Sequence, residues 1–281
     1  MTESLCSIPA SFSLAQTLDC GQAFRWQPLP GEPGAWQGAA QDKALVVREA
    51  QGRMHFSCSQ AEFDSFWRGY FDLDEDYEAK RAALSALSPV LAEAAAFAPG
   101  IRLLQQDPWE ALCSFIISQN NNIPRIKGIL QRLCQGWGSP IPGTGLSSFP
   151  APQALMGETP ESLAPLRAGF RAKYLIDAAQ KVSSGEVSLE AVDKAPLEEA
   201  RRELQKIRGV GPKVAECALL YGFHKTRCFP MDVWMKRAMH TLLPGFSPED
   251  FGENAGLAQQ YIFHYSRMHP ALFAKAAGEN P

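Results

Sequence analysis

The chain has 281 residues, 27 of them basic and 30 acidic, with a formal net charge of −3. This length suffices for two domains with a well-buried core, and the balanced charge excludes nucleic-acid binding through a general basic excess. Basic residues are nevertheless concentrated between residues 201 and 213, with smaller groups around residues 125 and 167–173. Such groups are usually solvated helix faces, so charge alone leaves nucleic-acid binding open.

Seven cysteines are spread along the chain without a Cys-x2-Cys pair, so neither a zinc site nor an iron–sulfur cluster is indicated. An odd number of cysteines without a disulfide framework indicates a reducing compartment. The N-terminus lacks a basic region followed by an apolar run, and no later apolar run approaches membrane-spanning length. We therefore expect a soluble, intracellular protein, in the cytoplasm or nucleoid of a prokaryote, with the nucleus left open for a eukaryote.

Residues 10–58 contain short apolar runs separated by turn residues, a pattern typical of antiparallel strands. We predict strands at residues 21–26, 44–48 and 54–58. Residues 62–97 are predicted to be helical because their large apolar residues share one helix face. Pro99-Gly100 is the best single boundary. We therefore predict an N-terminal domain of antiparallel β-sheet plus helices at residues 1–98 and a helical domain at residues 99–281.

The second domain is predicted to be helical throughout. Asp107-Pro108 has the form of a capped helix start, the polar residues 119–122 interrupt that helix, and Pro124 starts the next one. After a loop rich in proline and glycine, further helices are predicted at residues 166–181, 197–207, 214–221, 233–243 and 253–267, followed by a loose tail at residues 272–281.

The tripeptide Gly209-Val210-Gly211 separates two predicted helices at about residues 197–221. Two glycines around a valine allow a tight hairpin whose backbone N–H groups point outward, and Pro212 suits the first turn of the second helix. The pattern predicts a helix-hairpin-helix, whose amides hold a DNA phosphate without side-chain charge. An ordinary helix connection with a glycine C-cap is about as frequent. Backbone carbonyls of the same turn could also hold a cation that bridges to phosphate, namely those of Gln205, Ile207 and Val210.

Lys213 lies in the first turn of the second hairpin helix, and Asp232 follows 19 positions later (232 − 213). A lysine must be neutral to act as a nucleophile, and most lysines in such positions merely lie near phosphate. Asp232 directly precedes a helix and could simply be its N-cap. Taken together, an amine that attacks a sugar C1′ and a carboxylate that stabilises oxocarbenium-like charge form a coherent N-glycosidic mechanism.

Three motifs point to one family: Gly-Val-Gly-Pro-Lys-Val-Ala-Glu-Cys at 209–217, Phe-Pro-Met-Asp-Val at 229–233 and Ser-Gln-Asn-Asn-Asn-Ile-Pro-Arg-Ile at 118–126. They closely resemble motifs of the 8-oxoguanine DNA glycosylase/lyases, which belong to the helix-hairpin-helix (HhH-GPD) superfamily. The resemblance extends over nearly the whole chain, including residues 18–26 and 103–108. It implies an α+β fold, in which a TATA-binding-protein-like antiparallel-sheet domain precedes an all-helical glycosylase domain.

The resemblance implies a bifunctional enzyme of base-excision repair that flips 8-oxoguanine, opposite cytosine, out of duplex DNA and excises it. Lys213 is implied to be the nucleophile that displaces the base and holds the sugar as a Schiff base before β-elimination. Asp232 is implied to stabilise the charge that builds at C1′. No catalytic metal, organic cofactor or obligatory protein partner is implied, and we expect a monomer that acts on double-stranded DNA.

Four further positions match the family's base pocket. The carbonyl oxygen of Gly21 is implied to accept the N7 hydrogen that 8-oxoguanine has and guanine lacks, which is an economical discriminator between the two bases. Cys217 and Phe263 are implied to lie against the two faces of the flipped base, and Gln259 to pair with its Watson–Crick edge. From the residues alone, ordinary packing is the alternative for Cys217 and Phe263.

Four other positions match residues that handle the duplex left behind. Asn120 resembles the wedge that enters the hole, Arg125 and Arg171 resemble the pair that recognises the widowed cytosine, and Phe170 is implied to intrude beside it. From the residues alone, Asn120 could be only a loop or cap residue and Phe170 a core residue. The joint occurrence of these residues in family order favours the DNA-binding interpretation.

The chain also departs from the family pattern. Trp234 stands where many members have a histidine that contacts the DNA backbone, and Ser266 stands where they have an acidic residue. Phe170 lacks the hydroxyl group of the family's more frequent tyrosine. These differences bear on phosphate positioning and on opposite-base choice, and they leave the lysine and aspartate untouched.

Two other hypotheses stay open. The first is a glycosylase of the same superfamily for another damaged base, such as an alkylated adenine, although that subgroup typically lacks the hairpin lysine. The second is a non-catalytic DNA-binding module that uses the hairpin only to hold phosphate. A strand-nicking assay on a duplex that contains 8-oxoguanine separates all three.

Overall fold

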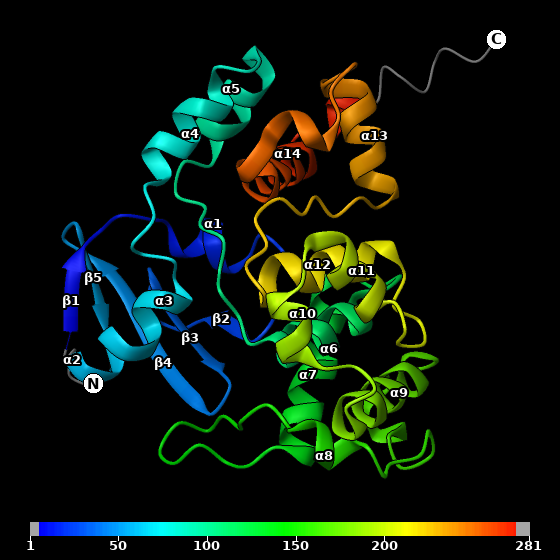
Figure 1. Ribbon diagram of the computed structural model, residues 1–281. Coiled ribbons are helices and arrows are strands. Elements are labelled where there is room, and N and C mark those ends of the chain that lie inside the picture. Colours follow the sequence, from blue (N-terminus) through cyan, green and yellow to red (C-terminus); the bar gives the residue numbers. More distant parts are fainter. Residues whose placement is uncertain (1–5, 274–281) are drawn as a thin grey trace.

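The computed structural model describes residues 6–273. Antiparallel strands form one sheet at one side of the molecule, in the order β1-β5-β4-β3-β2, and helices make up the rest (Figure 1). The strands are β1 (Cys6–Pro9), β2 (Trp26–Pro28), β3 (Ala35–Ala40), β4 (Lys43–Ala50) and β5 (Arg53–Phe56). The predicted α+β class, with an antiparallel sheet followed by helices, is confirmed.

One face of the sheet is buried, which explains the alternation in β4 and β5. Leu45 and Val47 in β4 and Met54 and Phe56 in β5 are buried, while their neighbours along each strand are more exposed. This period of two is what a sheet covered on one face requires. The ring of Phe56 lies 4.8 Å from that of Phe63, which belongs to the helical segment packed on this face.

The prediction of a strand at residues 21–26 is wrong except at its last residue, because β2 begins at Trp26. Gly21 has a φ of +92°, which no strand residue adopts. The buried side-chain amide of Gln22 donates hydrogen bonds to the carbonyl oxygens of Thr17 and Arg102, at 2.9 and 2.7 Å. These contacts with distant residues make the segment a connection instead of a strand. The pattern also does not indicate β3, which has no β-branched residue.

The region predicted to be helical at residues 62–97 is helical in two parts. The first part covers the sheet and consists of α2 (Gln60–Glu62), the π-helical turn η1 (Phe63–Trp67) and α3 (Arg68–Tyr70). The second part is the helix pair α4 (Tyr77–Ser85) and α5 (Pro89–Phe97). Asp72, with a φ of +51°, lies in the break between them. A short helix, α1 (Leu14–Leu18), precedes β2.

The remaining helices follow the predicted order. They are α6 (Pro108–Ser118), α7 (Ile123–Trp137), α8 (Pro152–Leu155), η2 (Ala164–Leu166), α9 (Arg171–Ser184), α10 (Leu189–Lys194), α11 (Leu197–Leu204), α12 (Pro212–Gly222), α13 (Val233–Leu242), η3 (Pro248–Asn254), α14 (Ala255–Met268) and η4 (Pro270–Phe273). Asp107 caps α6 as predicted, since its carboxylate accepts a hydrogen bond from the Glu110 amide at 2.8 Å. The helix predicted from residue 166 begins only at Arg171, because Arg167 and Gly169 have φ values of +55° and +60°.

The predicted loose tail at residues 272–281 begins too early, since residues 272 and 273 belong to η4. Its other positions, residues 274–281, lie outside the described residues. None of the helices between residues 6 and 273 is long and apolar enough to cross a membrane.

The sheet and the helices are joined by buried polar contacts. The Leu104 amide donates to the Gln22 side-chain oxygen at 2.9 Å, and the Gln106 side chain donates to the Gln22 carbonyl oxygen at 2.7 Å. An ion pair of 2.8 Å between Arg25 and Glu110, both largely buried, adds a second link. In Figure 1, α14 lies beside α5, and α6 to α12 form a separate group of helices. The domain boundary after residue 98 stays a prediction.

Candidate active site

The helix-hairpin-helix is formed by α11, the turn at residues 205–211 and α12. Gly209 has a φ of +81° and packs so closely on Tyr174 that an added Cβ would lie 2.3 Å from its ring. Gly211 is the N-cap of α12, and Pro212 occupies its first turn. The amide N–H groups of Gly209 and Gly211 donate to no acceptor within the described chain. They are therefore available to an anion at the helix N-terminus.

A cavity of about 50 Å³ lies between α12, α14 and the segments that precede α13 and β2. It brings together six residues that the sequence singles out for the chemistry or for the base: Gly21, Lys213, Cys217, Asp232, Gln259 and Phe263. These positions are up to 242 residues apart in the chain (263 − 21) and come from four different segments. Their convergence in one cavity is a property of the fold that no local pattern shows.

Four other residues line the same cavity without a predicted role there: Phe115, Tyr221, Pro230 and Gln260. The adjacent glutamines Gln259 and Gln260 are a signal that the sequence itself contains. The pair lies within a helix that is otherwise apolar on this side, and both residues are buried. Two adjacent buried amides require hydrogen-bond partners. Such a pair indicates that this side of the helix faces a polar site inside the protein. Tyr221 has no comparable signal, since an apolar helix readily accommodates a tyrosine.

Lys213 is half-buried in the first turn of α12. Its Nζ lies 5.4 Å from the centre of the Phe115 ring, so the ammonium group faces an aromatic wall. Phe115 is in turn stacked on Tyr221, with ring centres 5.2 Å apart. Within residues 6–273 the lysine forms no salt bridge, so it is not tied to a carboxylate. The amine is thus held at the cavity by the Phe115 ring and by its hydrogen bond to the Cys217 sulfur.

Cys217 lies one helical turn after Lys213, and its side chain is buried. Burial raises the pKa of this thiol to about 11, against the opposing effect of the Lys213 charge and its hydrogen bond to the sulfur. The thiol is therefore protonated at neutral pH and does not compete as a nucleophile. It offers a neutral, polarisable surface to a planar ligand.

Asp232 is both the N-cap of α13 and a wall of the cavity. One carboxylate oxygen accepts a hydrogen bond from the Met235 amide at 2.7 Å, so the N-cap interpretation is correct. The cap fixes the side chain without removing it from the cavity. The segment before it is anchored to α12, because Glu216 accepts a hydrogen bond from the Phe229 amide at 2.8 Å and pairs with Arg201.

Gly21 faces Phe263 across the cavity. A Cβ added to Gly21 would lie 3.6 Å from the Phe263 ring, and the φ of +92° favours glycine at this position. The hydrogen bonds of the neighbouring Gln22 hold this backbone in place. Phe263 lies one turn after Gln259 on α14, so one helix supplies two walls of the cavity.

The four predicted duplex-binding residues gather at the turn between α6 and α7 and at the start of α9. Asn120 is exposed at the tip of that turn and has a φ of +47°, which a residue with a side chain rarely adopts. Arg171 is buried and donates hydrogen bonds to the carbonyl oxygens of Gln119 and Asn120, the latter at 2.8 Å. Its guanidinium also lies 4.4 Å from the exposed ring of Phe170.

Arg125 and Arg171 therefore differ in their surroundings. Arg125 is exposed in the first turn of α7, whereas desolvation and the nearby Arg125 charge lower the pKa of the Arg171 guanidinium. The structure thus brings the two arginines near each other and gives Arg171 a role that sequence reasoning missed. It holds the backbone of the turn that carries Asn120.

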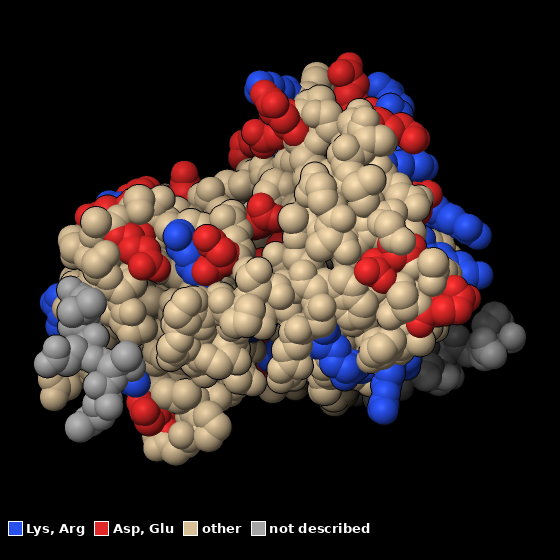
Figure 2. All heavy atoms as spheres, turned by 90° about the horizontal axis from the view of Figure 1, so that it is seen from below, with Lys and Arg blue, Asp and Glu red and all other residues tan. Residues whose placement is uncertain are grey.

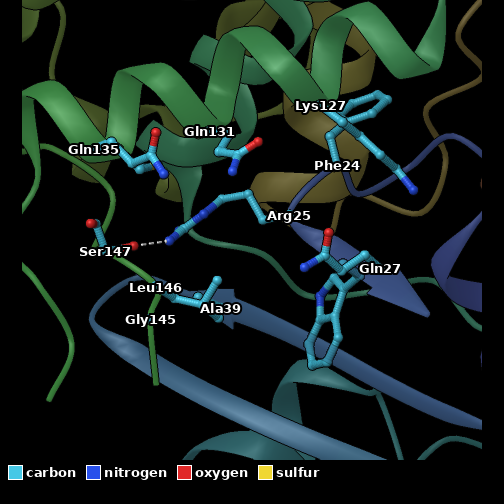
Figure 3. A pocket seen from close by; sticks show the side chains of 12 residues that line it. Phe24, Arg25, Gln27, Ala39, Lys127, Gln131, Gln135, Gly145, Leu146 and Ser147 are labelled. Carbon is cyan, nitrogen blue, oxygen red and sulfur yellow. Dashed lines mark hydrogen bonds between the residues drawn. The ribbon is translucent and has the colours of Figure 1, made fainter. Parts of the chain in front are cut away.

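A second cavity, of about 100 Å³, lies between α7 and the sheet (Figure 3). Gln131 and Gln135 reach toward it from α7, and Arg25 extends across it to donate a hydrogen bond to the Ser147 carbonyl oxygen. The Arg25 charge is already paired with Glu110. None of the predicted site residues lines this cavity, so its contacts serve to join the sheet to the helices.

Charge on the surface is mixed. Figure 2 shows one face, on which acidic and basic side chains are interspersed among uncharged residues. This agrees with the formal net charge of −3. Any grip on phosphate must therefore come from local groups such as the hairpin amides, since a general positive field is lacking on this face.

Comparison with known proteins agrees with this arrangement. Residues 5–112 match the family model "8-oxoguanine DNA glycosylase, N-terminal domain", and residues 113–245 match "HhH-GPD superfamily base excision DNA repair protein". The 8-oxoguanine glycosylase/lyase of Clostridium acetobutylicum, in complex with double-stranded DNA, is 37% identical. Its structure superimposes with a TM-score of 0.86 over 92% of this chain and 93% of that chain.

Two curated relatives are also similar. The N-glycosylase/DNA lyase of Saccharomyces cerevisiae is 34% identical over 80% of this chain and 66% of its own length. The probable N-glycosylase/DNA lyase of Methanothermobacter thermautotrophicus is 32% identical over 62% of this chain and 65% of its own length. The chain thus spans just under two thirds of the length of these relatives. From the two family models and the C. acetobutylicum structure, the chain belongs to the 8-oxoguanine DNA glycosylase family of the HhH-GPD superfamily.

Proposed function

We propose that this protein is a bifunctional DNA glycosylase and AP lyase that excises 8-oxoguanine opposite cytosine from double-stranded DNA. The observation that carries the proposal is the convergence of Lys213 and Asp232 in one cavity with the residues expected to hold the base. Relatives support it: the S. cerevisiae protein is named an N-glycosylase/DNA lyase, and the C. acetobutylicum enzyme is described with DNA containing cytosine opposite 8-oxoguanine.

In the proposed reaction the neutral amine of Lys213 attacks C1′ of the extruded nucleotide while the bond from C1′ to the base breaks. The base leaves with the bonding electron pair and takes up a proton. The carboxylate of Asp232, fixed by its cap at the edge of the cavity, stabilises the positive charge that develops on the sugar. Since no ion pair engages Lys213 in the described chain, no salt bridge has to break first.

The second step follows from the covalent bond to Lys213. Loss of protons from the nitrogen and opening of the sugar ring give a Schiff base, which draws electrons from C2′. A proton then leaves C2′ and the 3′-phosphate departs, so the strand is cut by β-elimination. Hydrolysis of the Schiff base returns the lysine. The protein positions the amine relative to the sugar. The hairpin expected to hold the phosphate leads directly into α12, and Lys213 lies in the first turn of that helix.

The base would lie between Cys217 and Phe263, with the carbonyl oxygen of Gly21 accepting the N7 hydrogen of 8-oxoguanine. The half-buried ring of Phe263 and the buried thiol of Cys217 both line the cavity of about 50 Å³.

Contact with the duplex is assigned to two backbone turns. The free amides of Gly209 and Gly211 would hold a phosphate beside the target nucleotide, with Val210 between them. Asn120 would fill the space that the base leaves, while Phe170, Arg125 and Arg171 approach the widowed cytosine. A cation on the hairpin carbonyls stays a prediction, as do the monomeric state and the soluble, intracellular location.

A strand-cleavage assay tests the proposal. Duplexes that differ at one position, with 8-oxoguanine opposite cytosine, guanine opposite cytosine, or an alkylated adenine, are incubated with the protein and resolved on denaturing gels with and without alkali. We expect cleavage at 8-oxoguanine alone, already without alkali. Cleavage only at the alkylated adenine would instead indicate a glycosylase for another damaged base, and cleavage that requires alkali would indicate excision without the lyase step. Binding of all three duplexes without cleavage, even after alkali, would indicate a non-catalytic module.

A further inference from the structure

Three side chains at the deep end of the cavity form a closed hydrogen-bonded group. They are Tyr221 on α12 and the adjacent Gln259 and Gln260 on α14. Their exposed fractions are only 2%, 6% and 2%, and all three line the cavity. The group joins the helix that carries the proposed nucleophile to the helix that carries the proposed base-recognition residue.

The contacts of Gln259 distinguish the two ends of its amide. Its Oε1 accepts a hydrogen bond from Gln260 Nε2 at 3.0 Å and a longer one from the Tyr221 hydroxyl at 3.4 Å. Its Nε2 lies on the other side and donates to the Pro230 carbonyl oxygen at 3.4 Å. Gln260 Nε2 also donates to the Tyr221 hydroxyl oxygen, which closes the group.

Rotation of the Gln259 amide by half a turn would reverse these contacts. With Gln260 in its present orientation, the amide nitrogen would then face the Gln260 nitrogen, which has only hydrogens to offer. The oxygen would face the Pro230 carbonyl oxygen, a repulsive contact that rotation of Gln260 does not relieve. Burial raises the pKa of Tyr221 well above its ordinary value, so its hydroxyl keeps its proton and remains available to Gln259 across the physiological pH range. In the flipped orientation Gln259 Oε1 thus loses the hydrogen bonds from Gln260 and Tyr221, and it lies against the Pro230 carbonyl oxygen, which repels it.

The direction of this amide matters for a purine edge. A 6-oxopurine presents an acceptor at position 6 and a donor at position 1, whereas a 6-aminopurine presents a donor at position 6 and an acceptor at position 1. An amide held in one orientation complements only one of these orders in a given pose, while a freely rotating amide complements both.

We propose that Gln260 and Tyr221 are positioning residues that lock the Gln259 amide and so restrict the cavity to bases with a 6-oxo edge. This inference rests on the proposed function, because it assumes that Gln259 meets the edge of an extruded purine. With the amide fixed in this way, two independent contacts select the base. Gly21 recognises the N7 hydrogen of the damaged position, and Gln259 recognises the Watson–Crick edge.

The second amide group of the network supports this assignment. Gln260 Oε1 is buried and finds no hydrogen-bond partner in the described part of the chain. A leucine or methionine would pack at such a position without an orphaned acceptor. Gln260 therefore costs the fold some stability through this oxygen, which lacks a partner among the described residues. Its nitrogen donates two hydrogen bonds, to the Tyr221 hydroxyl oxygen and to Gln259 Oε1, and these orient the cavity side chains.

The test compares 8-oxoguanine with 8-oxoadenine in otherwise identical duplexes, each opposite cytosine. Both bases carry the C8 oxygen and the N7 hydrogen, so they differ at the edge that Gln259 would meet. Single-turnover excision rates are measured for the wild type, Gln260→Leu and Tyr221→Phe. Cleavage of a preformed abasic site, which has no base, is measured in parallel. Tyr261→Phe is the matched control, because Tyr261 is buried next to Gln260 and does not line the cavity.

We expect the preference for 8-oxoguanine over 8-oxoadenine to fall by about tenfold or more in Gln260→Leu, the effect of one buried hydrogen-bond mismatch. A smaller fall is expected in Tyr221→Phe, whose contact is longer, and none in Tyr261→Phe. Abasic-site cleavage should stay within about twofold in Tyr261→Phe, and in the other two variants it should fall less than excision of 8-oxoguanine, because an abasic site has no base edge to recognise. If Gln260→Leu fails to fold, the ratio in Tyr221→Phe decides the question.

An unchanged preference in folded Gln260→Leu or Tyr221→Phe would overturn the lock while the proposed function stands. An equal fall in the excision rates of 8-oxoguanine and 8-oxoadenine would likewise show that Gln260 and Tyr221 only pack the cavity and do not orient Gln259. A wild-type protein that cleaves abasic DNA but leaves 8-oxoguanine in place would overturn the proposed function and the lock together. The abasic substrate thus distinguishes failure of the proposed function from failure of the proposed role of Gln260 and Tyr221.

Discussion

The indole N–H of Trp234 donates a hydrogen bond of 2.9 Å to Ser266 Oγ, which joins the start of α13 to the end of α14. Ser266 is fully buried and donates its own proton to the Phe263 carbonyl oxygen at 3.0 Å. Asp232, two residues before Trp234, is thereby linked to the helix that carries Gln259 and Phe263. Two of the three departures from the family pattern are thus partners, and they join the proposed charge-stabilising residue to the base pocket.

We predict that Ser266→Ala destabilises the protein by about 0.5–1.5 kcal/mol, because the N–H of the half-buried Trp234 indole loses this acceptor. Base excision should slow more than cleavage of an abasic site, since the walls of the base cavity lose their link. Urea unfolding and single-turnover rates measure the two effects. The exposed Ser65→Ala is the control and should change the free energy of unfolding by less than about 0.5 kcal/mol. Equal stability of the two variants would contradict the assigned role of the hydrogen bond.

Arg171→Ala and Arg125→Ala should have different consequences. Arg171 is buried and holds the carbonyl oxygens of the turn at Asn120, so its removal should cost about 1–3 kcal/mol of stability. Arg125 is exposed, and its removal should leave stability within about 0.5 kcal/mol of the wild type. Both variants should lose preference for cytosine opposite the lesion. Excision rates against all four opposite bases measure this preference, and equal wild-type rates would contradict a role for either arginine in it.

The two glycines of the hairpin provide a matched pair. Gly209→Ala places a methyl group 2.3 Å from the Tyr174 ring at a φ of +81°, so it should cost about 1–3 kcal/mol and weaken binding to DNA. Gly211 has an ordinary φ of −87° and open space around its Cβ position. Gly211→Ala should therefore cost less than Gly209→Ala, about 0.5–1 kcal/mol, because alanine is a poorer N-cap than glycine. Unfolding in urea and titration with an abasic-site duplex at fixed salt give the two readouts. Identical behaviour of the variants would show that the turn is not held in this conformation.

Alkaline pH should weaken the fold through Cys217. A thiol in the unfolded chain has a pKa of 9.0, whereas burial raises the pKa of Cys217 to about 11. Its contribution is fully present below pH 9.0 and is lost as pH rises toward about 11, because the unfolded chain then binds fewer protons than the folded protein. The free energy of unfolding is measured in reducing buffer at about pH 8 and about pH 10. Cys217→Ala should show a decline shallower by about 1 kcal/mol over this pH range, and a decline as steep as that of the wild type would rule out this titration.

Local signals predict the hairpin well and the pocket poorly. Gly209 and Pro212 mark a left-handed turn and a helix start within a few residues, and the structure has both. The strand predicted at residues 21–26 fails because Gln22 bonds to residues far along the chain, which no local pattern contains. The pocket positions came from the family resemblance, since alternation and helical periodicity do not show which helices meet.

The residues that sequence reasoning missed depend on tertiary contacts. Tyr221 and Gln260 acquire their role only where α12 meets α14. Arg171 acquires its second role only where α9 reaches the turn after α6. A buried polar pair such as Gln259-Gln260 is nonetheless visible in a sequence, and it is the signal that would have directed attention to this part of the pocket.

The nucleophile is the centre of the account, and borohydride trapping tests it most directly. Borohydride reduces a Schiff base to a stable secondary amine, so wild-type protein and a duplex with 8-oxoguanine opposite cytosine should yield a covalent adduct. The control Lys206→Gln changes an exposed hairpin lysine that does not line the cavity, and it should retain the adduct. Lys213→Gln should yield none, on the lesion or on an abasic site. An undiminished adduct in Lys213→Gln would contradict the assignment of this lysine as the nucleophile.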